Sequence, residues 1–255
     1  MSKLDVIFVH PNASKKIYQD LNKKYSAIET PLWAGLLANR ARLDGYDAKI
    51  IDCEAENIDS QSAAKKIGAL SPKLAVIVVY GQQPSASTQN MEGASVLCDM
   101  LHEHYPNIKT LLVGLHPSAV SRKTMQMEKA NFVCQGEGPK TISGLLEIDM
   151  DDKEQLKTVP GLWYRDEELI KCNTPAPIIT QENLHIELPG VAWDMLPMEK
   201  YRTSNWHAMS NNGDRSAFAS IYTSLGCPFQ CSFCCINAPF GNNNLENWNY
   251  GRNKF

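Results

Sequence analysis

Short apolar runs alternate with amphipathic segments through residues 6–146, and this alternation restricts the fold more than any other feature of the sequence. The apolar runs, at 6–9, 48–51, 75–80, 111–113 and 132–134, are rich in strand formers. Helical spacing of apolar residues predicts helices over 31–46, 60–70, 87–105, 121–129 and 140–146, the second with Ser60 as its N-cap. Strands that alternate with helices in this way form a parallel sheet covered by helices on both faces.

The expected fold is therefore α/β, a flavodoxin-like (Rossmann-like) five-stranded parallel sheet over residues 1–148 with strand order 2-1-3-4-5. Ligands bind such sheets beyond the carboxyl ends of the strands. The loops there are rich in glycine, small residues and amides, which let a backbone approach a bulky ligand closely. Candidate ligand contacts are Asn12 after the first strand, Gly81, Gln82 and Ser85 after the third, Gly114 and His116 after the fourth, and Gly136, Glu137 and Gly138 after the fifth. Glu137 could instead favour the start of the following helix, where negative charge is stabilising.

Composition and charge narrow the class of protein. The chain is 43% hydrophobic and 21% charged, as in ordinary globular proteins, and its net charge of −3 gives no electrostatic case for binding nucleic acid. The apolar run at 6–9 is too short for a secretion signal, and no run approaches the roughly 20 apolar residues that span a bilayer. We therefore expect a cytoplasmic protein without a membrane span.

Four of the eight cysteines fall close together, at Cys227, Cys231, Cys234 and Cys235. The spacing C-x-x-x-C-x-x-C puts three thiols on one short loop, and the neighbouring glycine and proline favour an irregular turn. Three thiolates can hold three irons of a 4Fe-4S cluster and leave the fourth iron open, which a catalytic centre needs. The scattered cysteines Cys53, Cys98, Cys134 and Cys172 are interpreted as small buried hydrophobic residues.

Three other interpretations of the cysteine group stay open. Structural zinc takes four ligands in two separated pairs, and here only Cys235 is available as a fourth, directly beside Cys234. A ferredoxin-type electron carrier also needs four ligands, at a different spacing. The remaining interpretation is that the thiols are unligated core residues, which four cysteines beside glycine and proline make the least favoured.

The pattern C-x-x-x-C-x-aromatic-C resembles the signature of radical S-adenosylmethionine (radical SAM) enzymes. Cys227, Cys231 and Cys234 match the three cluster ligands, and Phe233 matches the aromatic position. The resemblance implies that the open iron binds S-adenosylmethionine. It also implies that an electron from an external donor, such as flavodoxin or ferredoxin, cleaves S-adenosylmethionine to a radical that acts on a small-molecule substrate. By the same resemblance Cys235 is a packed thiol and no ligand.

The N-terminal half resembles the cobalamin-binding domain that precedes the radical domain in one class of these enzymes. The matching segments are 114–117, 136–138, 160–162 and 192–197. Many cobalamin carriers have a D-x-H-x-x-G motif after the first strand, and the stretch at 10–15 does not match it. The resemblance therefore implies cobalamin as a second cofactor without assigning an axial ligand. His116 is a candidate for that ligand, although a histidine in such a turn more often packs or hydrogen-bonds.

The sequence divides into three parts. After the sheet domain, 149–215 is expected to be a connector with a small hairpin and a proline-rich extended segment, and 216–255 to begin a radical SAM domain with a strand over 217–224. A complete barrel of this kind takes about 250 residues, so we expect an incomplete barrel and an inactive chain. The implied activity is methyl transfer to an unactivated centre or an anaerobic cyclisation. The alternative is a non-catalytic cobalamin-binding or flavodoxin-like module with a vestigial iron–sulfur motif.

Overall fold

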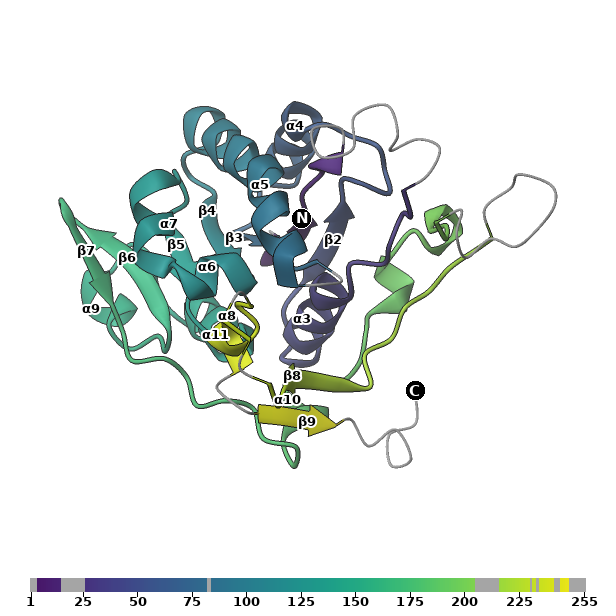
Figure 1. Cartoon of the computed structure of the whole chain (residues 1–255). Helices are drawn as coiled ribbons and strands as arrows, with labels where there is room; N and C mark the ends of the chain where they lie inside the picture. Colours follow the sequence, from purple (N-terminus) through teal and green to yellow (C-terminus); the bar gives the residue numbers. More distant parts are fainter. Residues whose placement is uncertain are drawn as a thin grey trace.

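A computed structural model describes residues 4–14, 26–81, 84–204, 216–229, 231–232, 234–240 and 244–247. Its main feature is a seven-stranded sheet in the order β2-β1-β3-β4-β5-β6-β7 (Figure 1). The strands are β1 (Val6–His10), β2 (Ala48–Asp52), β3 (Leu74–Val78), β4 (Lys109–Val113), β5 (Phe132–Cys134), β6 (Leu162–Asp166) and β7 (Leu169–Cys172). The first five are parallel and lie in the predicted order, so the expected α/β fold is confirmed.

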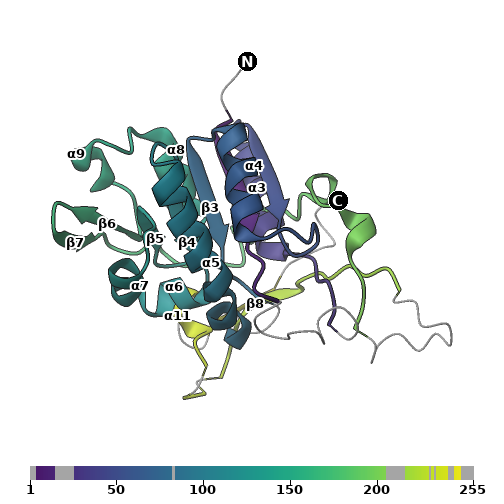
Figure 2. The ribbon, with the colours of Figure 1, turned by 90° about the horizontal axis from the view of Figure 1, so that it is seen from above.

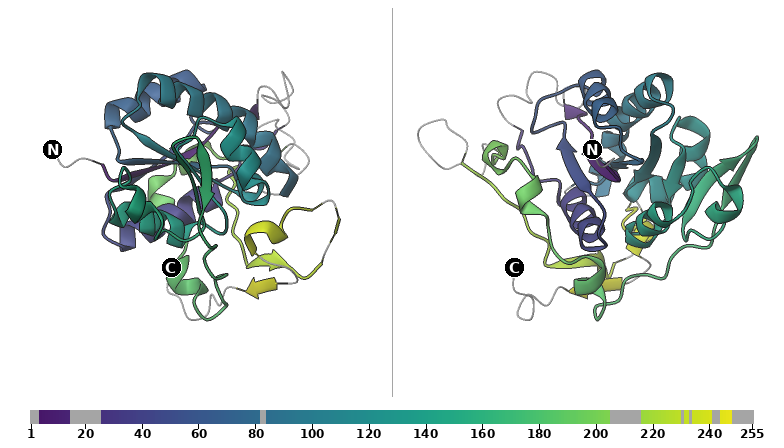
Figure 3. Two further views of the ribbon diagram at one scale, coloured as in Figure 1. Left: turned by 90° about the vertical axis from the view of Figure 1, so that its left-hand side faces the viewer. Right: turned by 180° about the vertical axis from the view of Figure 1, so that it is seen from behind.

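Helices cover both faces of this sheet, as Figures 2 and 3 show. The helices are α3 (Leu32–Leu43), α4 (Ser60–Leu70), α5 (Pro84–His104), α6 (Leu115–Ala119), α7 (Ser121–Met127) and α8 (Pro139–Glu147). One buried cluster joins α3 and α8 to one face, and a second joins α4, α5 and α7 to the other. In β1, Phe8 belongs to the first cluster and Ile7 to the second, and neither side chain is exposed. The central strands are therefore apolar on both faces, as is usual in a parallel sheet.

Some helix details differ from the sequence-based expectation. Helix α4 is capped by Asp59, whose carboxylate accepts the Ser62 N–H at 2.8 Å, so the assignment of Ser60 as N-cap is wrong. Leu43 and Val96 are exposed although both are apolar residues within predicted helices. In α3 the buried side is lined largely by alanine and leucine in the middle of the helix, and Leu43 lies in its last turn.

The hairpin β6–β7 belongs to the sheet, which corrects both the five-strand expectation and the placement of this hairpin in the connector. β6 pairs antiparallel with β5, with Phe132 opposite Tyr164 and Val133 opposite Trp163. The Arg165 guanidinium donates to the carbonyls of Ala130 (2.6 Å) and Glu128 (2.7 Å), just past the end of α7. A cation at a helix C-terminus satisfies carbonyls that the helix leaves without partners. These contacts attach the hairpin to the edge of the sheet.

The rest of the described chain runs along the sheet domain. It contains α9 (Lys153–Leu156), α10 (Leu184–Glu187), 3-10 turns at Trp193–Met195 and Met198–Lys200, β8 (Ser224–Cys227), α11 (Asn237–Phe240) and β9 (Asn244–Asn247). The strand expected over 217–224 is wrong, because the ladder begins only at Ser224 and pairs antiparallel with β9. The described residues thus form a two-stranded antiparallel sheet here. No helix in the described ranges is both long and apolar enough to cross a membrane.

Candidate functional site

The carboxyl ends of the parallel strands meet at one edge of the sheet, and the cysteine-bearing segment lies at that edge. Figure 2 shows α6, α11 and β8 together there, at the end opposite the N-terminus. Helix α11 contacts α6, and Leu225 of β8 is buried in the same cluster as α3 and α8. The two features that the sequence singled out separately, the loops and the cysteines, are therefore neighbours.

Hydrogen bonds fix the loops after β3 and β4 to each other. The Ser87 hydroxyl donates to the Val79 carbonyl and accepts the His116 N–H at 2.9 Å. Thr88 Oγ1 lies 3.1 Å from Nδ1 of the His116 ring. Burial lowers the pKa of His116, and nearby Lys123 lowers it further, so the ring is neutral at neutral pH. A neutral imidazole with Nδ1 held in this way leaves Nε2 as the nitrogen suited to a metal or a hydrogen-bond donor.

The candidate glycines have different environments. A Cβ at Gly114 would lie 2.5 Å from the Val79 carbonyl oxygen, and one at Gly81 would overlap Ala86, so both are needed for close packing within the protein. A Cβ at Gly138 would contact Leu37 and Val113. Gly136 has a φ of +128° and no atom within 4 Å of such a Cβ, and its N–H donates to Ser118 Oγ at 2.9 Å. Of these four glycines, Gly136 is the one whose Cβ side meets no atom within 4 Å.

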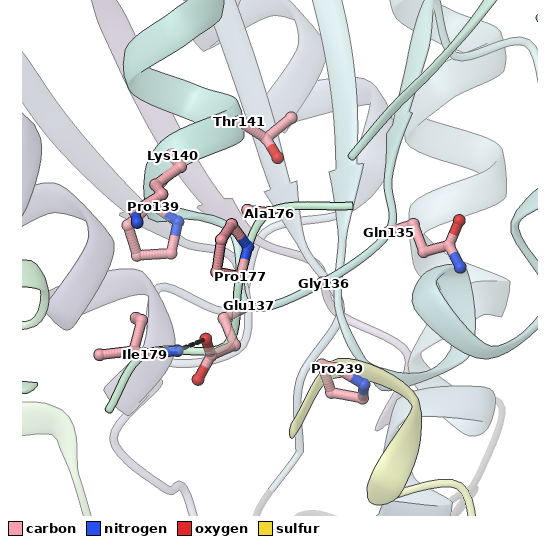
Figure 4. A pocket seen from close by; sticks show the side chains of 11 residues that line it. Gln135, Gly136, Glu137, Pro139, Lys140, Thr141, Ala176, Pro177, Ile179 and Pro239 are labelled. Carbon is pink, nitrogen blue, oxygen red and sulfur yellow. Dashed lines mark hydrogen bonds between the residues drawn. The ribbon is translucent and has the colours of Figure 1, made fainter. Parts of the chain in front are cut away.

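Glu137 joins this edge to the connector. It is 7% exposed, and its Oε2 accepts the Ile179 N–H at 2.6 Å (Figure 4). The Tyr80 hydroxyl donates to the Glu137 carbonyl at 3.5 Å. The Glu137 carboxylate, just before the start of α8 at Pro139, therefore holds the connector at Ile179. Pro239 of α11 lines the small pocket beside this loop, which again brings the C-terminal segment to the sheet edge.

Asn12 orders the loop after β1. Its Oδ1 accepts both the N–H and the hydroxyl of Ser14, at 3.1 and 2.7 Å, and its Nδ2 donates to the Cys53 carbonyl at 3.3 Å. Gly93 of α5 was not singled out from the sequence, although a Cβ there would lie 2.7 Å from the Asn12 carbonyl oxygen. Gln82, Phe233 and the side chain of Ser85 lie outside the described residues.

Sequence reasoning also missed a buried polar cluster at the ends of β1 and β2. Its members are His10, Asp52, Glu54 and Tyr201. His10 Nε2 lies 3.7 Å from Glu54 Oε2, and the Tyr201 hydroxyl donates to Asp52 Oδ2 at 2.9 Å. Burial disfavours the charged ring, but the hydrogen bond to Glu54 and the charges of Asp52 and Glu54 outweigh it and raise the pKa of His10. Burial likewise raises the pKa of Asp52.

The cysteines of the C-terminal segment are more accessible than most of the others. Cys227 and Cys234 are partly exposed and Cys231 is exposed. By contrast Cys53, Cys98 and Cys134 are buried as expected, and burial raises the pKa of Cys134 to about 12. Cys172 is exposed on β7, which corrects its interpretation as a buried residue. Cys235 packs partly buried against the main core, in agreement with a packed thiol.

The three predicted ligands are not gathered into a site in this structure. Within the described ranges, no three histidine, cysteine or acidic side chains are placed to hold one metal ion. Cys227 lies in β8 opposite Asn244, while Cys231 and Cys234 share a turn in which the Cys234 N–H donates to the Cys231 carbonyl at 3.1 Å. The donor set suits an iron–sulfur cluster by chemistry and accessibility, but the positions of the thiols do not.

Comparison with known families identifies the sheet domain. A family model described as the B12 binding domain matches residues 18–146, which is half of the chain. The chain belongs to the B12-binding domain family. The loops after β1, β3, β4 and β5 therefore lie at the carboxyl edge of the sheet in a B12-binding domain.

The curated relatives of this B12-binding chain are longer proteins. An uncharacterized methyltransferase of Pyrococcus horikoshii is 29% identical over 212 residues, covering 83% of this chain and 41% of that protein. An anaerobic magnesium-protoporphyrin IX monomethyl ester cyclase of Cereibacter sphaeroides is 24% identical over 233 residues, covering 90% of this chain and 34% of that protein. The chain therefore spans about two fifths or less of the length of these relatives.

Solved structures show the same fold at low sequence identity. The cobalamin-dependent S-adenosylmethionine radical enzyme OxsB aligns with a TM-score of 0.65 and 17% identity, covering 96% of this chain and 30% of OxsB. The radical S-adenosylmethionine methyltransferase TsrM of Kitasatospora setae aligns with a TM-score of 0.61 and 14% identity, covering 98% of this chain and 44% of TsrM. Both alignments extend past the sheet domain into the cysteine-bearing segment, because they cover nearly the whole chain.

Proposed function

We propose that this chain is the cobalamin-binding part of a radical SAM enzyme, and that it also supplies the cluster-binding cysteines. The observation that carries the proposal is the B12-binding family match over 18–146, on a sheet whose carboxyl edge adjoins the cysteine segment. The methyltransferase and cyclase names of the relatives favour methyl transfer to an unactivated centre or an anaerobic cyclisation, on a small-molecule substrate.

The proposed cobalamin site is the carboxyl edge of the sheet. Gly136 would let the corrinoid approach the backbone, because its Cβ side is open and Ser118 fixes its N–H. His116 would contact the cofactor through Nε2, since Thr88 engages Nδ1. Asn12, Gly81, Gly114, Glu137 and Gly138 would shape the loops around it. Gln82 and Ser85 complete the proposed set.

The proposed cluster ligands are Cys227, Cys231 and Cys234, with Phe233 beside them. A 4Fe-4S cluster bound there would supply the electron that cleaves S-adenosylmethionine, drawn from an external donor such as flavodoxin or ferredoxin. The protein's own part is to present accessible thiols near the corrinoid edge. Because the three thiols do not form a metal-binding group among the described residues, the proposal requires that cluster binding draws them together.

The test is to load the chain anaerobically with iron, sulfide and hydroxocobalamin, and to measure bound iron and cobalt after desalting. We expect one cobalt per chain and an iron–sulfur spectrum that changes when S-adenosylmethionine is added. Cys231→Ser should lose the iron and keep the cobalt, whereas the matched control Cys235→Ser should keep both. Equal iron in wild type and Cys231→Ser would refute the cluster assignment, and absence of cobalt would refute the cobalamin assignment.

A second candidate function is a non-catalytic cobalamin-binding module with a vestigial cysteine motif. It is favoured because the three thiols do not form a metal-binding group in the described part of the chain. This candidate predicts one bound cobalt per chain and no iron after the same reconstitution.

A further inference from the structure

A buried hydrogen bond joins the connector to the end of β2. The Tyr201 side chain is fully buried, and its hydroxyl donates to Asp52 Oδ2 at 2.9 Å, across 149 residues of sequence. Asp52 is 1% exposed, and its Oδ1 accepts the N–H groups of Glu54 and Ala55, both at 3.1 Å. The Asp52 carboxyl group therefore accepts hydrogen bonds both from the turn after β2 and from Tyr201 of the connector.

The burial of this carboxyl group makes its hydrogen bonds important to the link. A buried carboxylate is costly unless hydrogen-bond donors and opposite charge surround it. The Tyr201 hydroxyl and the two turn amides are donors to Asp52, and His10, which contacts Glu54, favours the ionised form of Asp52 when its ring is protonated. Removing the hydroxyl would leave Asp52 buried with one donor fewer, so the connector would lose more than an ordinary surface contact.

The residues that follow Tyr201 pair with the start of the segment that leads to the cysteines. Arg202 exchanges two backbone hydrogen bonds with Ile28, at 2.9 and 3.1 Å, and also forms a β-bridge with Ala217. The Thr203 N–H donates to the Ser216 carbonyl at 3.1 Å. Residues 216–217 lead directly to β8 and Cys227. The entry to the cysteine segment is therefore paired with the strip of backbone that Tyr201 anchors.

We propose that Tyr201 is a positioning residue that sets where the cysteine segment lies relative to the carboxyl edge of the sheet. The proposal deepens the proposed function and rests on it for the role of the cysteines. The anchoring itself needs no cofactor, so it can be measured on the chain alone. A merely structural role would instead make Tyr201 one of many residues that stabilise the whole fold.

Hydrogen exchange of the full chain distinguishes these roles. In Tyr201→Phe, the amides of Ile28, Arg202 and Thr203 should exchange about tenfold or more faster, because a hydrogen bond to a buried carboxyl group is lost. Amides of β1 and β3 should keep their wild-type rates. Tyr222→Phe is the matched control, since it removes a tyrosine hydroxyl from the cysteine segment and leaves the Asp52 link intact. Uniformly faster exchange, or no change, would overturn the proposal.

A spectroscopic measurement then tests positioning. In chain loaded with cob(II)alamin and a reduced cluster, the magnetic coupling between the two paramagnets should weaken or broaden in Tyr201→Phe and stay unchanged in Tyr222→Phe. Faster local exchange with unchanged coupling would refute the positioning role. If the wild-type chain loads neither cofactor, the proposed function fails, and the exchange pattern alone decides whether Tyr201 holds the segment.

Discussion

The loop that carries Gly136 depends on one serine, and replacing that serine is the most direct way to disturb the sheet edge without touching the core. Ser118 is 4% exposed, and its Oγ accepts the Gly136 N–H at 2.9 Å. Ser118→Ala removes the acceptor and leaves a partly buried N–H without its partner. Such a loss costs about 1–2 kcal/mol, between the net value of a hydrogen bond and the penalty for an unsatisfied buried group.

The loss of stability in Ser118→Ala can be measured by thermal unfolding. A domain of this size loses about 2–4 °C in Tm for each kcal/mol, so Ser118→Ala should melt about 2–8 °C lower. The affinity for hydroxocobalamin should fall as well, because Gly136 would no longer be held in place. Ser143→Ala is the control, since Ser143 donates to Asp44 at an exposed site, where a substitution changes stability by no more than about 0.5 kcal/mol. If Ser118→Ala matches wild type in both Tm and hydroxocobalamin retention, the argument that Ser118 preorganises this loop is wrong.

Two further substitutions test the buried cluster and the close packing at the edge. The pKa of His10 is raised in the folded chain, so the stability that protonation contributes is fully present below the ordinary histidine value of about 6.5 and is lost as the pH rises through the folded value. Urea titrations can measure the free energy of unfolding of wild type and of His10→Gln. The difference between the two should be larger at pH 6 than at pH 9. A difference that does not change with pH would contradict this. Gly114→Ala should destabilise the fold by about 1–3 kcal/mol, because its Cβ would meet a backbone carbonyl oxygen 2.5 Å away; an unchanged Tm would show that the strand ends are less closely packed.

The parallel sheet could be predicted because each strand is marked by a sequence pattern within its own segment. Each of the five strands is a short apolar run between turn residues, and the central ones are buried on both faces. The hairpin could be recognised too, but not its attachment to β5. That attachment depends on Arg165 reaching the carbonyls beyond α7 and on Trp163 Nε1 donating to Gln135 at 2.8 Å, and these contacts have no local sequence signal.

The loops of the candidate site were found by position alone, and their roles needed the structure. Gly114 and Gly136 look alike in sequence, yet one packs against Val79 and the other faces open space. The link between Asp52 and Tyr201 was missed because the two residues are distant in sequence and each is ordinary in its own segment. The strand expected over 217–224 was wrong because a segment with β-propensity also needs a neighbouring strand to pair with. Here Ser224–Cys227 pairs with β9.

The central claim is that cobalamin binds at the carboxyl edge of the sheet. Hydrogen exchange of the chain with and without hydroxocobalamin tests it most directly. Binding at this edge should protect the loops around Asn12, Gly81, His116 and Gly136, with little change in the turns at the opposite edge, near Gly45 and Ser71. Protection confined to that opposite edge, or none at saturating hydroxocobalamin, would contradict the account.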